Sequence, residues 1–202
     1  MDDLARPGGA GRPRGDTRER IQAVALDLFA EQGYEATSLR EIAERLGVTK
    51  AALYYHFKSK EDIVRSFTED YLGELDALLA WGAAQPRSAA TRAELLTRYG
   101  DIVGHRLGVL RFLEQNRAAL DHLLSEHGGP DRKQWLRAQF EALRDLLVPP
   151  DATLRDRVRA SMAVASVGIG CMHYHQVADQ AELREIVLEI ARDLTASAPS
   201  TT

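Results

Sequence analysis

A short segment, residues 37–60, constrains the fold of this 202-residue chain most strongly, because it carries two amphipathic stretches joined by a tight turn. The apolar residues of the first stretch recur at a spacing of three and four, as on one face of a helix: Leu39, Ile42, Ala43 and Leu46. Ser38 followed by Glu41 is the pattern of a capping box and predicts the start of this helix. Gly47 predicts its end, because glycine adopts a left-handed conformation at little cost.

The second stretch begins immediately after this turn. Thr49 can cap its start, and Leu53 and Phe57, four residues apart, are predicted to point inward. A turn this short directs the second helix across the first, which is the helix-turn-helix arrangement.

The outward side of the second helix indicates what it contacts. Lys50 and Tyr54 fall on a face away from the inward pair, His56 and Lys58 follow, and residues 50–60 contain no acidic residue. Cations and phenol or imidazole donors on a short helix suit a major groove walled by phosphates. The alternative is a solvated basic surface that joins two structural helices. The tight turn, both caps and the aromatic and basic residues together favour DNA binding.

The stretch LGVTKAALYYHFKSKEDI, residues 46–63, resembles the helix-turn-helix signature of the tetracycline-repressor (TetR) family. The close resemblance covers about residues 17–64, and beyond them only length and helical pattern agree. It implies an all-α fold, in which an N-terminal three-helix DNA-binding domain is joined by a long helix to a C-terminal ligand-binding and dimerisation domain. Members of this family are homodimers in which ligand binding usually lowers the affinity for an operator.

The resemblance also implies a set of DNA-contacting residues: Ser38, Arg40, Thr49, Lys50, Ala51, Tyr54, Tyr55, His56 and Lys60. Within this set, Lys60 would meet a backbone phosphate, and Arg40 matches a position that reaches bases in some members. Ala51 and Ala52 depart from members with polar residues or glycine at these positions, so the base preference does not carry over.

Charge and composition limit the alternatives. The net charge of −4 argues against a general nucleic-acid coat protein, but residues 1–60 carry +1 and the remainder −5, so positive charge is concentrated at one end. The single cysteine, Cys171, fits a reducing cytoplasm. The N-terminus lacks an apolar signal segment, and Asp2 and Asp3 oppose export. The longest mostly apolar run, Met162–Met172, is too short to span a bilayer. We expect a cytoplasmic protein that does not enter a membrane.

Three regions are predicted along the chain: a flexible basic arm at 1–15, a helix-turn-helix domain at 16–60 and a helical ligand-binding and dimerisation domain at 61–198. The arm is either a tail without a role or a segment that reaches the minor groove. Helical periodicity predicts helices in the larger domain at about 59–81, 91–103, 107–124, 132–148, 153–177 and 181–195, with a loop from His127 to Asp131.

The last two predicted helices carry more apolar surface than the end of a monomer should expose. Val187 and Ile190 are expected at a subunit interface. Small residues on the preceding helix would let another helix approach closely: Ser161, Ala165, Gly168 and Gly170. Two such hairpins can form a four-helix bundle around a twofold axis, although both faces could instead pack within one subunit.

A pocket for a medium-sized, partly apolar effector is predicted in the larger domain, where aromatic residues are concentrated. The predicted lining is Tyr71, Tyr99, Phe112, Trp135, Phe140, Met162 and His173, each of which could equally be plain core. Cys171 and His175 share one helix face and His173 lies on another, which leaves too few ligands for a structural metal. No cofactor or metal is predicted, and the absence of a nucleophile motif or glycine-rich phosphate loop argues against an enzyme.

The sequence therefore predicts a ligand-responsive transcriptional regulator, a repressor that binds a palindromic DNA operator as a homodimer and is released by a small effector. The alternative is a small-molecule- or metal-binding helical protein in which the helix-turn-helix is only a scaffold.

Overall fold

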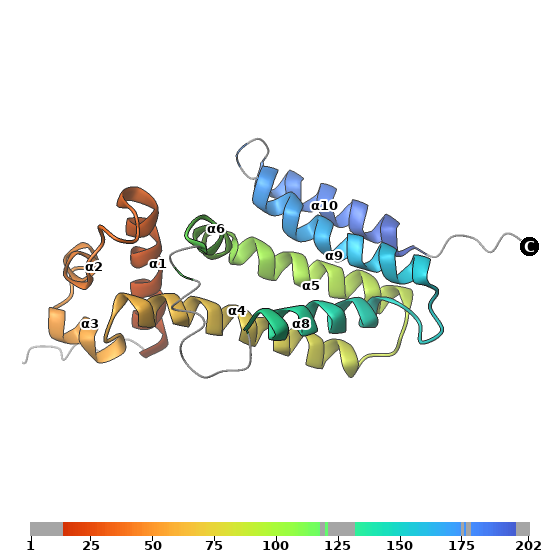
Figure 1. Cartoon of the computed structure of the whole chain (residues 1–202), viewed down its shortest axis with the longest axis horizontal. Coiled ribbons are helices and arrows are strands. Elements are labelled where there is room, and N and C mark those ends of the chain that lie inside the picture. The colour runs from red at the N-terminus through yellow and green to blue at the C-terminus, as the bar shows by residue number, and fades with distance from the viewer. Residues whose placement is uncertain (1–13, 118–119, 121–131, 175, 177–178, 197–202) are drawn as a thin grey trace, which may run out of the picture. The chain divides into compact units, whose positions relative to one another are not determined.

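The computed structural model describes residues 14–117, 120, 132–174, 176 and 179–196, and every regular element in those ranges is a helix (Figure 1). The predicted all-α fold is confirmed. The predicted basic arm falls almost entirely outside the described residues, as does the predicted loop at 127–131. None of the described helices is long and apolar enough to cross a bilayer.

The chain divides into two compact units, Met1–Val64 and Arg65–Thr202. The division falls inside α4 (Lys60–Ala83), four residues beyond the predicted boundary. The remaining helices of the first unit are α1 (Arg14–Gln32), α2 (Leu39–Leu46) and α3 (Lys50–His56).

The first unit is held together by apolar side chains that all three of its short helices contribute. These side chains are buried: Ile21, Ala25, Leu28 and Phe29 from α1, Leu39, Ile42 and Ala43 from α2, and Leu53 with the adjacent Phe57 from α3. Burying a side chain of this size stabilises a fold by roughly 1.5–3 kcal/mol relative to leaving it exposed. The buried hydroxyl of Thr37 donates to the carbonyl oxygen of Gly33 at 2.8 Å and so fixes the turn between α1 and α2.

The second unit is built around α5 (Ala89–His105). This helix contacts the other long helices that follow it: α6 (Leu107–Gln115), α8 (Arg132–Leu147), α9 (Leu154–Tyr174) and α10 (Gln180–Thr195). Helices α9 and α10 lie side by side as a hairpin (Figure 1). An added Cβ at Gly170 of α9 would overlap Cγ1 of Val187 on α10, so this glycine permits the close approach of the two helices.

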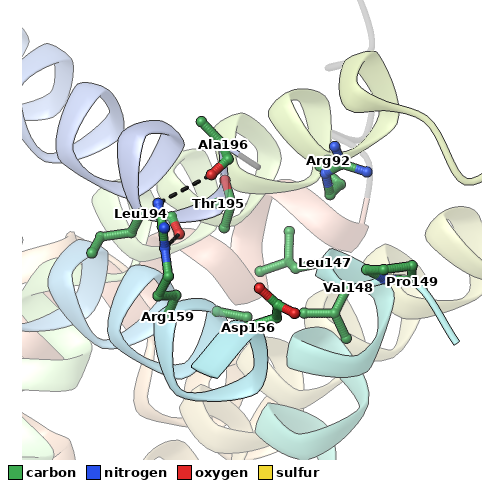
Figure 2. A pocket seen from close by; sticks show the side chains of 10 residues that line it. Arg92, Leu147, Val148, Pro149, Asp156, Arg159, Leu194, Thr195 and Ala196 are labelled. Atoms are coloured by element: carbon green, nitrogen blue, oxygen red, sulfur yellow. Dashed lines mark hydrogen bonds between the residues drawn. The ribbon is translucent and has the colours of Figure 1, made fainter. Parts of the chain in front are cut away.

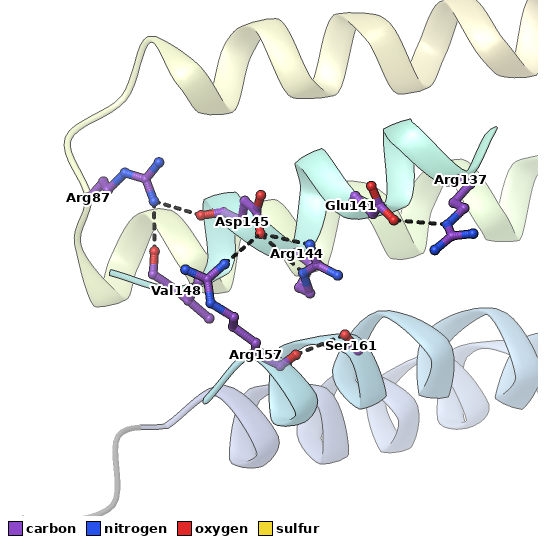
Figure 3. Close-up of polar contacts among 8 residues, drawn as sticks. All are labelled: Arg87, Arg137, Glu141, Arg144, Asp145, Val148, Arg157 and Ser161. Atoms are coloured by element: carbon purple, nitrogen blue, oxygen red, sulfur yellow. Dashed lines mark hydrogen bonds and ion pairs between the residues drawn. The ribbon is translucent and has the colours of Figure 1, made fainter. Parts of the chain in front are cut away.

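Two arginine side chains contact polar groups at the C-terminal end of α8 (Figure 3). Nη1 of Arg87 donates to the carbonyl oxygens of Asp145 and Val148, both at 2.7 Å. Nη1 of Arg157, on α9, lies 3.6 Å from Oδ1 of Asp145. Arg87 thus supplies donors to carbonyl groups that a helix C-terminus leaves without partners. The ion pair of Arg157 with Asp145 ties α8 to α9.

Candidate nucleic-acid interface and effector-binding core

Helix α2 begins at a side-chain capping box and ends at a left-handed glycine. The Ser38 backbone N–H donates to Oε2 of Glu41 at 2.8 Å, and the Glu41 N–H donates to Oγ of Ser38 at 3.3 Å, so the predicted capping box is present. Gly47 is left-handed with φ of 71°, and the next N–H, of Val48, donates to the carbonyl oxygen of Ala43 at 3.0 Å. The chain therefore leaves α2 abruptly.

Helix α3 starts three residues later and buries only one edge. The Ala52 N–H donates to Oγ1 of Thr49 at 3.2 Å, which caps its first turn. Leu53 and Phe57 are buried, and the Arg18 guanidinium lies 5.0 Å from the centroid of the Phe57 ring. The two helices and their short turn form the predicted helix-turn-helix.

The uncovered side of α3 is basic and aromatic. Lys50, Ala51 and Tyr55 are exposed, and Tyr54 and His56 are half-buried. Nζ of Lys50 lies 5.3 Å from the centroid of the Tyr54 ring, and the rings of Tyr55 and His56 meet edge to face at 5.3 Å. The helix carries no carboxylate. It therefore presents donors and flat rings to whatever lies against it.

The predicted DNA-contacting residues outside α3 already have partners within the protein. Oγ of Ser38 donates to Oε2 of Glu41 at 2.7 Å, and Nε of Arg40 lies 2.7 Å from Oε1 of Glu44. Nζ of Lys60 donates to the carbonyl oxygen of Tyr34 at 2.7 Å. Lys50, by contrast, makes no side-chain hydrogen bond to another described residue.

Three of the predicted pocket residues are buried in the larger unit: Tyr71, Tyr99 and Phe112. Phe140 is half-buried and packs against the same core. The hydroxyl groups of Tyr99 and Tyr71 are hydrogen-bonded to each other, and the rings of Tyr99 and Phe140 meet edge to face at 6.4 Å. Burial raises the pKa of Tyr71 to about 12 and also raises the pKa of Tyr99 well above its usual value. Both phenols are therefore neutral hydrogen-bonding groups in apolar surroundings.

The structure does not place Met162 or His173 in this core, which corrects the predicted pocket. Met162 is 57% exposed, and His173 is exposed with its Nδ1 donating to the carbonyl oxygen of Ile169 at 3.1 Å. Helix α9 has two apolar stripes, and the other one, which includes Ala163 and Val167, faces inward. Trp135 is half-buried on α8.

Two hollows bounded by described residues are lined by neither tyrosine of this pair. One, of about 300 Å³, runs beside Trp81. The Arg98 guanidinium, which also borders this hollow, lies 4.0 Å from the centroid of the Trp81 ring. Another, of about 230 Å³, lies where α8, α9 and α10 meet, between Arg92 and Arg159 (Figure 2). None of the predicted pocket residues lines either one.

Cys171 is buried, and burial raises the pKa of its thiol. No three His, Cys, Asp or Glu side chains within the described part of the chain are grouped so as to hold a metal ion.

Residues 21–67 match the sequence pattern of the family described as bacterial regulatory proteins, tetR family. This span runs from the buried part of α1 through the first turns of α4. Residues 21–67 therefore form a tetR-family DNA-binding domain.

Relatives named as regulators resemble part of the chain. The HTH-type transcriptional regulator AcrR of Shigella flexneri is 47% identical over 64 residues, 30% of each chain. The HTH-type transcriptional repressor KstR2 of Rhodococcus jostii is 38% identical over 84 residues, 40% of each chain. These alignments cover less than half of either relative.

Solved structures extend the likeness to most of the chain. A transcriptional regulator from Aquifex aeolicus superposes with a TM-score of 0.62 at 23% identity, covering 86% of this chain and 96% of that one. KstR2 of Mycobacterium tuberculosis superposes with a TM-score of 0.61 at 18% identity, covering 92% and 96%. At these identities the likeness establishes the tetR-family fold of the larger unit, and its ligand does not follow from it.

Proposed function

We propose that this tetR-family chain is a cytoplasmic transcriptional regulator that places α3 in the major groove of an operator. The observation that carries the proposal is the exposed basic and aromatic face of α3, free of carboxylates, on a helix-turn-helix fixed by caps at both helices. Lys50, in the first turn of α3, lies where recognition helices of this kind meet base edges. We assign repression because relatives such as KstR2 are named repressors.

We further propose that the α9–α10 hairpin forms a homodimer. Its outward side carries large apolar residues that are 44–78% exposed: Leu154, Val158, Met162, Ile169, Tyr174, Ile186 and Ile190. Exposed large apolar side chains gathered on one helical hairpin are typical of an interaction site. Two copies related by a twofold axis would bury it as a four-helix bundle and present two copies of α3 to a palindrome.

The proposed effector is a small, partly apolar molecule that binds beside the Tyr71–Tyr99 pair, where two neutral hydroxyl groups lie among aromatic rings. Its binding would weaken the DNA complex. Coupling of about 1–3 kcal/mol, which is typical of allosteric proteins, gives a roughly 5–150-fold change in affinity. Linkage requires the operator to weaken effector binding by the same factor.

Selection of bound sequences from random duplexes tests the proposal. The wild-type chain should enrich a palindrome with half-sites about 10 base pairs apart. Lys50→Ala should alter the enriched sequence, and Arg137→Ala, an equal charge change on the exposed side of α8, should not. Recovery of no common sequence by the wild-type chain would contradict the proposal.

A further inference from the structure

The hollow of about 230 Å³ in the larger unit has an apolar wall and three charged side chains (Figure 2). It lies where the end of α8, the start of α9 and the end of α10 meet the first turn of α5. The apolar wall consists of buried or half-buried side chains: Leu147, Val148, Ala160 and Leu194. The charged groups among its described lining residues are Arg92, Arg159 and Asp156. Pockets for drug-sized ligands occupy about 300–1,000 Å³, so this hollow suits a smaller molecule.

The guanidinium of Arg159 is already used within the protein. Its Nε donates to the carbonyl oxygen of Leu194 at 2.8 Å, and its Nη2 donates to those of Asp193 at 2.9 Å and Ala196 at 3.0 Å. The last carbonyl groups of a helix have no partners within the helix and carry partial negative charge. Arg159 therefore caps α10, and its charge is matched by the end of that helix.

The carboxylate of Asp156 is held by the start of its own helix. Its Oδ2 accepts hydrogen bonds from the N–H of Thr153 at 2.9 Å and from the Thr153 hydroxyl at 2.7 Å. These hydrogen bonds, and then the charges of Arg159 and Arg155, lower the pKa of Asp156. Asp156 is therefore an ionised capping group whose charge is balanced by neighbouring arginines.

Arg92, on α5, differs from both of these groups. Its side chain is half-buried beside the hollow, yet its guanidinium makes no hydrogen bond, ion pair or ring contact to another residue in the described part of the chain. A guanidinium that loses hydration without gaining a partner is unfavourable. A carboxylate is the group that matches its planar fork, through two parallel hydrogen bonds.

We propose that this hollow binds a small amphipathic carboxylate, whose charged group pairs with Arg92 and whose apolar part lies against Leu147, Val148 and Leu194. Neither tyrosine of the proposed effector site lines the hollow, so this is a second site, beyond the proposed function. The bound acid would contact α5, α8 and α10 together. Because it binds only the folded chain, it would also stabilise the larger unit.

Isothermal titration calorimetry of the full chain with hexanoate tests the site. Hexanamide, which has the same alkyl chain but no charge, should bind about tenfold more weakly, because hydrogen bonds between charged groups are the stronger kind. Acetate should bind more weakly by roughly fourfold for each CH₂ group that the hollow no longer buries. The proposal is overturned by an absence of hexanoate binding at about 10 mM, by equal binding of the amide, or by equal binding of acetate or inorganic phosphate.

Arg92→Met keeps the length of the side chain and removes its charge. It should weaken hexanoate binding by about tenfold or more, without lowering the unfolding midpoint of the ligand-free protein. Arg155→Met is the matched control, because it removes the charge of an exposed arginine near Asp156 that does not line the hollow. Equal weakening in the two variants would mean that hexanoate responds only to the general charge of the surface, and no site at Arg92 would remain.

Nuclear magnetic resonance of ¹³C-methyl-labelled protein locates the bound acid. Hexanoate should shift the methyl signals of Val148 and Leu194, which line the hollow. Tyr99→Phe should leave hexanoate affinity unchanged, because Tyr99 does not line it. Shifts confined to other methyl groups, or loss of hexanoate binding in Tyr99→Phe, would place the acid elsewhere and overturn the proposal. The titration contains no DNA, so its outcome is independent of whether the chain binds an operator.

Discussion

The two units of this protein expose opposite kinds of surface. The helix-turn-helix unit buries the apolar stripes of α2 and α3 in its own core and leaves basic and aromatic residues such as Lys50 outside. The α9–α10 hairpin buries one apolar stripe and leaves a second, which includes Met162, Ile186 and Ile190, exposed. A helix with one stripe has only one way to pack. A helix with two stripes can serve its own core and a second subunit together.

The largest expected effect concerns the exposed stripe of the hairpin. Ile186→Glu with Ile190→Glu should convert the proposed dimer to monomers, because burying two unpaired carboxylates from each subunit is strongly unfavourable. Sedimentation equilibrium should show association weakened by about 100-fold or more. The variant should also bind DNA with only half-site affinity.

Ala138→Glu with Ala142→Glu is the matched control for this change, since it adds the same charges at exposed positions of α8. If the Ile186 and Ile190 variant sediments as a dimer, the interface lies elsewhere. Val187, which the sequence suggested as an interface residue, is not suited to this test, because it is 5% exposed and packs against Gly170 inside the subunit.

Core truncations test whether the two units unfold separately. Leu53→Ala in α3 and Leu188→Ala in α10 each remove a fully buried side chain and should each cost about 2–5 kcal/mol. Hydrogen exchange should show that each variant loses protection mainly in the unit that carries the substitution. Of the two variants, only Leu53→Ala should abolish DNA binding while the chain remains dimeric. Equal losses of protection throughout the chain in both variants would show that the units unfold as one.

A smaller effect is expected for Lys50 on the exposed face of α3. A lysine in this position can donate to guanine O6 and N7, a contact worth roughly 1–3 kcal/mol of discrimination. Lys50→Ala should therefore relax the preference at one base pair of each half-site, measured by competition between single-base operator variants. Lys58→Ala serves as the comparison and should change no base preference. A selected sequence that is the same for Lys50→Ala and the wild type would mean that α3 is oriented differently.

The smallest effect concerns the capping box of α2. Ser38→Ala should lower the free energy of unfolding by about 1 kcal/mol, measured in urea. Hydrogen bonds from Ser38 lower the pKa of Glu41 below its usual value of 4.5. The carboxylate therefore stabilises the fold above that pH, and this contribution is lost as the pH falls through the lowered pKa. The difference in unfolding free energy between variant and wild type should narrow as the pH falls below 4.5, and a difference that widens in acid would contradict this origin.

The sequence by itself determined the helix-turn-helix because its signals are local. Ser38 reaches Glu41 three residues away, Gly47 ends α2 by its own backbone conformation, and Thr49 caps the next helix. Contacts within four residues depend only on the helix that they form. The chemistry of the α3 surface could be predicted for the same reason, since helical periodicity places Lys50 and Tyr54 on one face.

Only the tertiary structure decided which of two apolar stripes on α9 faces inward, and it removed Met162 and His173 from the predicted pocket. It also decided what Lys60 contacts, because the carbonyl oxygens of Tyr34 and Glu35 lie 26 and 25 residues away in the sequence. Periodicity shows that a stripe exists but not which neighbour covers it. A contact across that separation depends on how α1, α2 and α4 pack, and no pattern within a single helix encodes it.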